Sequence, residues 1–393
     1  MKPIIKRFQD ILLKIYYKYK KDLLLSKSSI NNLDNTSDYS FLNHFGNIHY
    51  FKKDKVWLAT GNDEINYILK NEQLFTTSEL YKFIDHLDIL MGELNERNQM
   101  IRKMIKEIIS VKLFAELEIF IKSESEQILN NLLEKNQIDF QKEFSEKITL
   151  EVMCFVFGFR NELTKDILKK YEPQIQDFEN IMQFFDLIYT NNIEFEENRL
   201  ADRLQKLIVE KTISTEEASI ISRIVWFGGI DTTSKLLSNL LIGLYQDKNV
   251  TSKLANDPKL HSKYIEENLR LSPPVDFVQR FIKTDVTIGK AKLTKGSIVF
   301  LDIRLGNRDS KVFESAEQFS FDQNKNRHLS FGNGVHQCLG MGLARFEAKL
   351  LLPDLFKIYN QFHIEDIKYR RDIGVVIINR FSTFKLRKNN VTC

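Results

Sequence analysis

The residues best suited to chemistry lie close together near the end of the chain. His336 and Cys338 stand in the stretch FGNGVHQCLGMGLARFE, with glycines at positions 332, 334 and 340 around them. A cysteine thiolate can act as a nucleophile or as a metal ligand. An apolar helical pattern follows directly, and backbone N–H groups near a helix start stabilise negative charge. The sequence therefore points to one thiolate in a tight glycine-rich loop as the centre of its chemistry.

Four interpretations of the loop around Cys338 can be compared. A zinc site would need a second ligand pair, but Cys154 and Cys393 are isolated and the other histidines are scattered. A dinucleotide-binding loop fits poorly, because no third glycine follows Gly334 at the required spacing. A cysteine nucleophile with His336 as its base stays open. The favoured interpretation is a thiolate that binds the metal of a flat ligand such as haem. Glycines have no side chain, so they would allow the backbone to approach such a ligand closely.

A second candidate lies in the middle of a long predicted helix. Gly228 and Gly229 stand together there, and each costs about 1 kcal/mol relative to alanine in a helix. Close packing against another helix would explain them. A functional alternative is that side chains were removed to make room for a ligand beside Asp231 and Thr232. The helix alone leaves both explanations open.

The pattern along the chain predicts a mainly α fold with a small β part. Apolar residues recur every three or four positions from Glu96 to Asp247, and Ser214 with Glu217 forms a capping box that begins the long helix. We find no linker or repeat, and expect a single domain over residues 1–393. Short strand signals occupy Asn47–Thr60, Asp285–Asp302 and Gly374–Leu386.

Composition excludes some classes of function. The 57 basic and 53 acidic residues give a net charge of +4, so a nucleic-acid partner is not expected. Three distant cysteines favour a reducing, cytoplasmic location over a disulfide framework. Residues 1–25 are apolar but broken by basic residues, which predicts an amphipathic helix rather than an integral membrane anchor. Packing on the protein is favoured for this helix, and contact with a membrane surface stays open.

The thiolate loop resembles the haem-binding loop of the cytochrome P450 family, of the soluble bacterial type. The pattern in question is Phe331-Gly332-x-Gly334-x-His336-x-Cys338-x-Gly340-x-x-Leu343-Ala344-Arg345. Other family landmarks occur in the expected order: Gly228-Gly229-x-Asp231-Thr232-Thr233, then Glu267-x-x-Arg270 before Ser272-Pro273-Pro274, then Asn307-Arg308-Asp309. The resemblance spans nearly the whole chain and implies a long central helix over the haem, with the thiolate loop before a late helix.

The resemblance implies roles for individual residues. Cys338 would be the axial ligand of the haem iron, and Asp231 and Thr232 would deliver protons, with Thr232 bonded to the Gly228 carbonyl so that the helix widens to admit dioxygen. Glu267 and Arg270 would form a structural ion pair. Further cofactor contacts are expected from Arg102, Arg280, His336, Phe331, Gly332, Gly340 and Gly228. Expected substrate-pocket residues are Phe227, Val275, Phe277 and Phe381.

Two positions depart from the family pattern. Asn98 stands where bacterial members usually have a histidine that contacts a haem carboxylate. Gln323 aligns with an arginine that usually joins the Glu–Arg pair; it could still hydrogen-bond but supplies no charge.

The implied activity is insertion of one oxygen atom from O2 into a small or medium hydrophobic substrate, by hydroxylation or epoxidation, in secondary-metabolite biosynthesis. The alternatives are desaturation, ring closure or coupling, or a non-catalytic haem-binding sensor. The cofactor would be haem b, and electrons would come from NAD(P)H through a ferredoxin or flavodoxin with its reductase. A basic patch of Arg97, Lys103, Lys106 and Lys112 would steer that donor to a monomeric enzyme.

Overall fold

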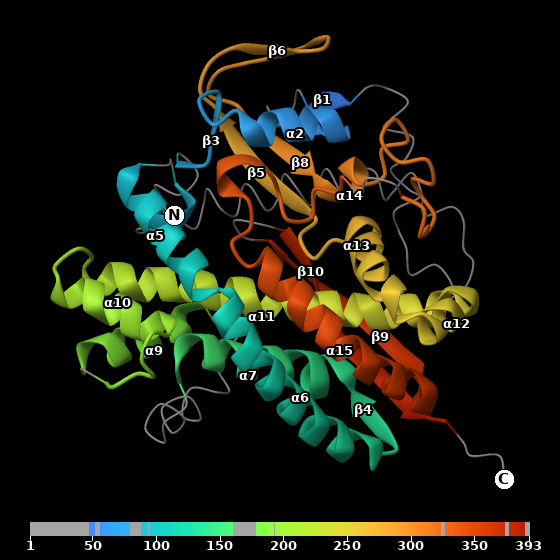
Figure 1. Ribbon diagram of the computed structural model, residues 1–393. Coiled ribbons are helices and arrows are strands. Elements are labelled where there is room, and N and C mark those ends of the chain that lie inside the picture. The colour runs from blue at the N-terminus through green and yellow to red at the C-terminus, as the bar shows by residue number, and fades with distance from the viewer. Residues whose placement is uncertain are drawn as a thin grey trace. The chain divides into compact units, whose positions relative to one another are not determined.

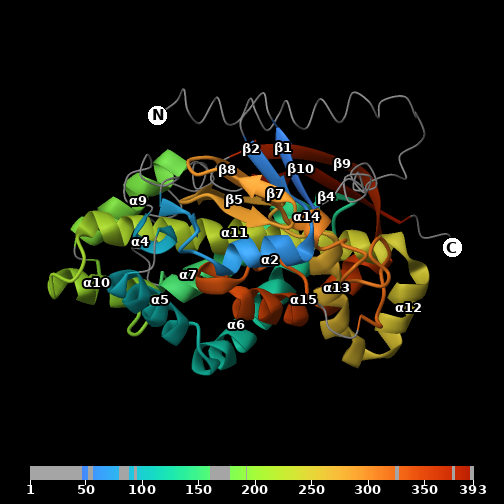
Figure 2. The ribbon, with the colours of Figure 1, turned by 90° about the horizontal axis from the view of Figure 1, so that it is seen from above.

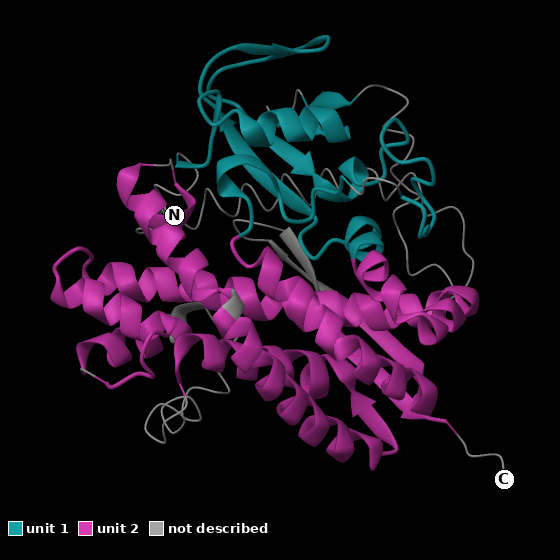
Figure 3. Ribbon diagram, viewed as in Figure 1, with its two compact units in different colours: residues 1–84, 266–338, 370–380 teal, residues 85–265, 339–369, 381–393 magenta. Residues whose placement is uncertain are grey.

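The computed structural model describes residues 47–51, 56–78, 88–92, 95–159, 178–191, 193–323, 327–373 and 377–389. The amphipathic helix predicted over residues 1–25 lies outside these ranges. The chain divides into two compact units: unit 1 is residues 1–84, 266–338 and 370–380, and unit 2 is residues 85–265, 339–369 and 381–393 (Figure 3). The expectation of a single domain stays a prediction, and each unit is described by itself.

Unit 2 is built mostly from helices (Figure 1). They are α4 (Asp88–Met91), α5 (Glu96–Ile108), α6 (Val111–Leu133), the π-helix η2 (Gln141–Ser145), α7 (Glu146–Phe157), α9 (Phe178–Thr190), α10 (Leu200–Val209), α11 (Thr215–Gln246), α12 (Lys248–Asn256) and α15 (Met341–Gln361). The helix α13 (His261–Leu271) and the strands β9 (Phe362–Ile373) and β10 (Ile377–Lys388) contribute residues to both units. Within unit 2, α11 packs against α7, α9 and α15.

The start of α11 is the predicted capping box. Ser214 Oγ accepts a hydrogen bond from the Glu217 N–H at 3.1 Å, and Glu217 Oε2 accepts from the Ser214 N–H at 2.7 Å. Arg97 on α5 adds a third contact, with its Nη2 2.5 Å from Glu217 Oε2. Three donors therefore converge on two side chains at this helix start, and two of them are backbone N–H groups that have no partner within the helix itself.

An aromatic cluster forms much of the core of unit 2. Trp226 on α11 contacts Phe157 and Phe159, with ring centroids 5.4 and 6.0 Å apart, and also packs on Phe184 and Phe185 of α9. All five rings are at most 3% exposed. Aromatic burial of this kind dominates core energetics, so these phenylalanines stabilise the helix packing.

Unit 1 contains four strands of a larger mixed sheet, in the order β1-β2-β8-β5 (Figure 2), and β3 pairs with β5. Its elements are β1 (Ile48–Phe51), β2 (Val56–Ala59), α2 (Asn62–Lys70), β3 (Phe75–Thr76), β5 (Phe277–Ile282), β6 (Val286–Ile288), β7 (Ala291–Leu293), β8 (Ile298–Asp302), α14 (Ile303–Gly306) and the 3-10 turn η5 (Gly334–His336). β2 pairs parallel to β8, whereas β1 and β5 pair antiparallel to their neighbours. One face of the sheet packs on α2 through buried apolar side chains such as Ile65, Val299 and Leu301.

The predicted ion pair is present in unit 1 and is fully enclosed. Arg270 Nε and Nη2 donate to the two oxygens of Glu267 at 2.9 and 2.7 Å, and the side chains are 0% and 2% exposed. Arg270 also donates to four backbone carbonyls, those of Asn307, Ser315, Ala316 and Gln318. The Ser320 N–H donates to Glu267 at 3.0 Å. The pair therefore holds the segment from residue 307 to residue 320 against α13.

Gln323 does not take the place of the family's additional arginine. Its Nε2 is buried without a hydrogen-bond partner among the described residues. Glu267 receives its remaining hydrogen bond from the Ser320 backbone instead. The fold therefore supplies a backbone N–H to this carboxylate in addition to the Arg270 guanidinium.

Replacing Arg270 by leucine should destabilise the protein by about 3–5 kcal/mol, because a carboxylate and four carbonyls would stay buried without their donor. Urea unfolding, followed by far-UV circular dichroism, measures this loss. The matched control is Lys122→Gln, which breaks the exposed Lys122–Glu118 pair on α6 (2.7 Å) and should cost less than about 1 kcal/mol. Equal losses in the two variants would contradict the structural role of Arg270.

Candidate functional site

The thiolate loop makes a tight turn in unit 1. Gly332 and Gly334 have φ angles of +67° and +72°, which side chains rarely adopt. At Gly334 a Cβ would also lie 2.4 Å from the Leu69 carbonyl oxygen of α2. The turn is closed by the Cys338 N–H, which donates to the Phe331 carbonyl at 2.9 Å. The Cys338 side chain is exposed at the end of this turn.

The loop is anchored at its base by Asn307, the first residue of the Asn-Arg-Asp landmark. Asn307 is 0% exposed, accepts from the Leu329 N–H at 2.6 Å and donates to Ser330 Oγ at 2.9 Å. Ser330 Oγ in turn donates to the Leu269 carbonyl of α13 at 2.7 Å. The chain entering the thiolate loop is thus held on the helix that carries the ion pair.

A histidine that sequence reasoning missed adds to this anchor. His328 Nε2 lies 3.1 Å from Glu266 Oε2 on α13, and His328 Nδ1 accepts from the Ser330 N–H at 3.2 Å. Its side chain is only 3% exposed. Its position three residues before Phe331 could have drawn attention to it, but the sequence alone does not show which residues a single histidine contacts.

Two of the expected haem-carboxylate donors lie in unit 1. Arg280, on β5, is 7% exposed and donates to the Gln279 carbonyl at 2.8 Å. His336, in η5, has its Nε2 3.1 Å from Glu72 Oε1 and 3.5 Å from Thr77 Oγ1. A cysteine nucleophile would require His336 as its base, yet this imidazole nitrogen faces a carboxylate. The donor roles of Arg280 and His336 stay predictions.

The donor set in unit 1 fits a haem better than a zinc ion. Among the described ranges, no group of three or more His, Cys, Asp or Glu side chains lies close enough to hold a metal. One exposed thiol remains, on a turn whose glycines keep side chains away from it: a Cβ at Gly332 or at Gly340 would meet no atom within 4 Å. A single thiolate and a flat open approach are what a haem iron requires of its protein.

In unit 2 the two glycines of the α11 turn have different surroundings: close packing explains Gly229, and room for a ligand at Gly228 stays a prediction. A Cβ on Gly229 would lie 2.3 Å from Met153 Sδ of α7, so this glycine permits close helix packing. A Cβ on Gly228 would meet no atom within 4 Å, so this position is open. Thr232 Oγ1 donates to the Gly228 carbonyl at 2.6 Å, as expected, although α11 stays α-helical through this turn.

The other expected unit 2 residues are placed as follows. Asp231 is half-buried on α11, one residue before Thr232. Arg102 is partly exposed on α5, and Gly340 is the N-cap of α15. The cofactor contacts of Arg102 and Gly340 stay predictions.

The expected substrate-pocket residues differ in their surroundings. Phe381, on β10, is 5% exposed and packs on Tyr369 and Phe384 at ring distances of 4.8 and 5.6 Å, as a core residue does. Phe277 is covered by the Arg304 guanidinium, 4.8 Å from its ring centroid. Val275 and Phe227 are half-buried. Phe277 is half-buried too, and the pocket roles of Phe227, Val275 and Phe277 stay predictions.

A buried carboxyl in α15 also escaped sequence reasoning. Glu347 is 2% exposed and its Oε2 has no hydrogen-bond partner among the described residues. Burial raises its pKa well above the ordinary value of a glutamate. Nothing in its sequence context separates it from the exposed glutamates of other helices.

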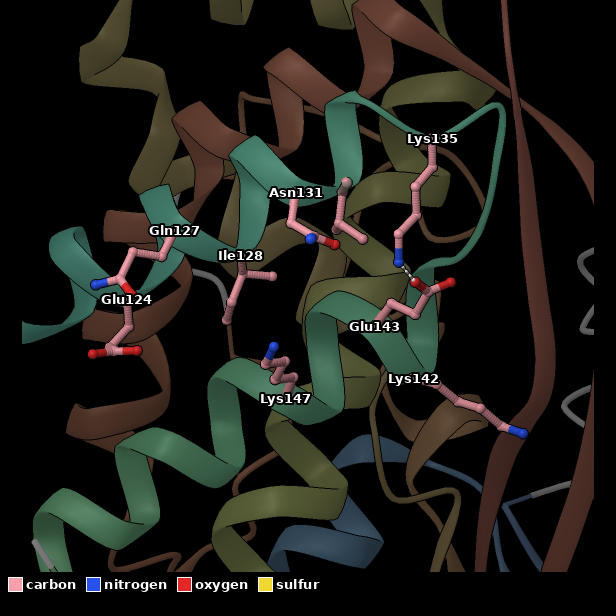
Figure 4. Close-up of a pocket in the computed structure, with 9 residues that line it drawn as sticks. Glu124, Gln127, Ile128, Asn131, Lys135, Lys142, Glu143 and Lys147 are labelled. Atoms are coloured by element: carbon pink, nitrogen blue, oxygen red, sulfur yellow. Dashed lines mark hydrogen bonds and ion pairs between the residues drawn. The ribbon is translucent and has the colours of Figure 1, made fainter.

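The groove shown in Figure 4 is not the expected substrate site. It lies in unit 2 between α6 and the η2–α7 segment, has a volume of about 460 Å³ and is lined mainly by charged and amide side chains. Lys135 and Glu143 are paired across it at 2.5 Å. Partial burial raises the pKa of Glu143, but hydrogen bonds from Lys135 and the Asp139 N–H outweigh this and lower it below its ordinary value. None of the expected site residues lines the groove.

The fold and the thiolate loop together define a haem-thiolate protein. The family described as Cytochrome P450 matches residues 151–367, more than half of the 393 residues, and the chain belongs to that family. Its fold is mainly helical with small sheets, as expected, and it is a cytochrome P450 monooxygenase. No helix in the described part of the chain is long and apolar enough to cross a membrane.

Known relatives cover most of the chain at low identity. The polyketide biosynthesis cytochrome P450 PksS of Bacillus subtilis (strain 168) is 23% identical over 338 residues, which are 79% of this chain and 81% of the relative. Cytochrome P450 119 of Sulfolobus acidocaldarius is 28% identical over 274 residues, 68% of this chain and 73% of the relative. The crystal structure of CYP109E1 from Bacillus megaterium in complex with testosterone matches with a TM-score of 0.80 at 22% identity, covering 92% of this chain and 100% of that chain.

The two glycines of α11 should respond differently to alanine. Gly229→Ala should lower the free energy of unfolding by about 1–3 kcal/mol, because Met153 is itself only 2% exposed and has little room to move. Gly228→Ala should leave stability unchanged or raise it by up to about 1 kcal/mol through helix propensity. Urea unfolding of both variants checks the pair. A larger loss at Gly228 than at Gly229 would contradict the packing described.

Proposed function

We propose that the protein inserts one oxygen atom from O2 into a small or medium hydrophobic substrate, by hydroxylation or epoxidation. The observation that supports this most directly is the hydrogen bond from Thr232 Oγ1 to the Gly228 carbonyl beside an open glycine position. A haem-binding sensor has no need of a hydroxyl held at that point of the helix. The arrangement therefore favours an enzyme in which this helix delivers protons during the reaction.

The residues proposed to hold the haem are those that the family resemblance implies. Cys338 would bind the haem iron, and Arg102, Arg280 and His336 would donate to the haem carboxylates, where charge-assisted hydrogen bonds are the stronger kind. Further backbone and side-chain contacts would come from Phe331, Gly332, Gly340 and Gly228. When bound, haem b would supply dioxygen activation, which a cysteine thiolate ligand promotes.

The proposed work of α11 is proton delivery. Asp231 takes protons from solvent, and Thr232 holds a water by its Oγ1 so that a proton reaches dioxygen in the right place. The Gly228 carbonyl fixes the rotamer of Thr232, because a 2.6 Å hydrogen bond orients the hydroxyl hydrogen along the helix. Asp231 then has a defined acceptor for the proton that it passes on.

Electrons are proposed to come from NAD(P)H through an external ferredoxin or flavodoxin with its reductase. The expected basic patch is shared by two helices, with Arg97, Lys103 and Lys106 on α5 and Lys112 on α6. Arg97 pairs with Glu217 and also donates to the Thr212 carbonyl at 3.0 Å, so its charge is already compensated. Exposed Lys106 and Lys112, together with Lys103, which lies 3.9 Å from Glu107, are left as the steering charges.

The proposed substrate class rests on the apolar character of the expected pocket residues and on the names of two relatives. Phe227 and Val275 offer half-buried apolar surface. Relatives include the cyclomarin C epoxidase CymV of Salinispora arenicola and the PksS protein of polyketide biosynthesis. A secondary-metabolite intermediate with an extended apolar skeleton is therefore the proposed substrate.

The reduced protein should show the strongly red-shifted carbonyl Soret band that a thiolate opposite carbon monoxide produces. Cys338→His should abolish that shift, because imidazole donates less electron density. An absorption spectrum of the dithionite-reduced protein under carbon monoxide measures both. The control is Cys154→Ser, at the buried cysteine of α7, which should keep the shifted band. A shift that survives in Cys338→His would refute the proposed ligand.

Thr232→Ala should keep haem and substrate binding but lower the product formed per NAD(P)H severalfold, with hydrogen peroxide rising in step. The reason is that loss of Oγ1 leaves proton delivery to dioxygen undirected. The matched control is Thr232→Ser, which keeps a hydroxyl able to reach the Gly228 carbonyl and should stay coupled. Product, peroxide and NAD(P)H are measured in the same reaction, and unchanged coupling in Thr232→Ala would contradict the role.

A further inference from the structure

A buried polar network joins the π-helix η2 to α11 inside unit 2. Its centre is Gln141, the first residue of η2, which is 5% exposed. Its Oε1 accepts from Ser238 Oγ at 2.7 Å, and its Nε2 donates to Ser234 Oγ at 3.3 Å and to Glu146 Oε1 at 3.1 Å. One amide thus uses three of its four hydrogen-bonding positions, two of them on successive turns of α11.

The π-helical geometry lets this segment hold α11 at two points. Ser145, the last residue of η2, is 0% exposed, and its Oγ lies 3.2 Å from Ser238 Oγ. The outer face of η2 is fixed as well, because Glu143 accepts from Lys135 and from the Asp139 N–H at 2.8 Å (Figure 4). Single π-turns are rare and are often found at functional sites. This one is clamped on both faces.

The network ends on the backbone of the α11 turn that carries the proposed proton-delivery residues. Ser234 Oγ accepts from Gln141 and donates to the Asp231 carbonyl at 3.2 Å. Its single hydrogen is therefore directed to Asp231 because Gln141 occupies its acceptor side. Three residues earlier the Gly228 carbonyl accepts from Thr232. Two side-chain hydroxyls thus bond to carbonyls of neighbouring turns, and Gln141 controls one of them.

We propose that Gln141 is a positioning residue: through Ser234 and Ser238 it fixes the conformation of α11 from Gly228 to Ser238, and with it the placement of Asp231 and Thr232. The part that concerns coupling of oxygen insertion rests on the proposed function. Gln141 does not itself touch dioxygen, substrate or haem. Its influence passes through the hydroxyl groups of Ser234 and Ser238, which are both buried and hydrogen-bonded to the Gln141 amide.

The test compares Gln141→Leu with Thr149→Val in the purified full-length protein. Leucine removes the amide at similar volume. Thr149 is a matched control, because it is 0% exposed on α7, and among the described residues its hydroxyl donates to the backbone carbonyls of Ser145 and Glu146, at 2.9 and 3.1 Å, and not to a side chain of α11. Both variants lose a buried polar group next to the same helix, so a merely structural effect should be similar in the two.

Hydrogen–deuterium exchange of the peptide spanning residues 228–238 is the first readout. We expect Gln141→Leu to exchange at least about tenfold faster there than Thr149→Val, which corresponds to about 1.4 kcal/mol of local opening. Equal exchange in the two variants would overturn the proposal. Ser238→Ala should reproduce part of the effect, and a Ser238→Ala variant without any change in this peptide would also count against it.

Product formed per NAD(P)H is the second readout. Gln141→Leu should lose coupling severalfold while keeping the red-shifted carbonyl band, and Thr149→Val should stay coupled. Normal coupling in Gln141→Leu would overturn the link to Asp231 and Thr232. A wild-type protein without the shifted band would instead refute the proposed function, and the exchange rates, which need no turnover, would still decide whether Gln141 positions α11.

Discussion

The buried pair of Glu267 and Arg270 is the constraint on which the thiolate loop depends. Two opposite charges at almost zero exposure are stable only when every remaining donor and acceptor is satisfied, and here backbone groups of residues 307–320 complete the set. Asn307 connects this pair to the loop, because its carbonyl accepts from Arg270 while its side chain holds Leu329 and Ser330. Two hydrogen bonds therefore separate the ion pair from the chain that leads to Cys338.

Local patterns allowed much of the fold to be predicted. The capping box at Ser214 specifies a helix start by itself, and the strand signals in Asn47–Thr60 and Asp285–Asp302 contain β1, β2 and β8. β5 was not expected, because FVQRFI lies next to a proline turn and its pairing with β8 is made by residues far along the chain. The π-helix at Gln141 also escaped prediction, since its contacts come from serines on α11.

In the candidate site, too, features set by local sequence could be predicted and features set by distant contacts could not. The family landmarks identified Cys338 and the Thr232 contact to Gly228, because both lie within one loop or one helical turn. The other features depend on residues far away in the sequence. Met153 of α7 leaves no room for a side chain at Gly229, and the rings of Tyr369 and Phe384 bury Phe381 in the core. Whether a glycine or a phenylalanine faces a ligand or a neighbouring side chain depends on packing between distant segments, which residue spacing does not contain.

The two left-handed glycines of the thiolate loop also differ in how freely evolution or design could vary them. At Gly332 only the backbone angle excludes a side chain, and asparagine tolerates that angle better than other residues. At Gly334 the angle and the Leu69 carbonyl act together, so no substitution relieves both. In a library randomised across this loop, asparagine should therefore be accepted at position 332, whereas position 334 should accept only glycine. The contact at Gly334 thus fixes the distance between α2 and the loop.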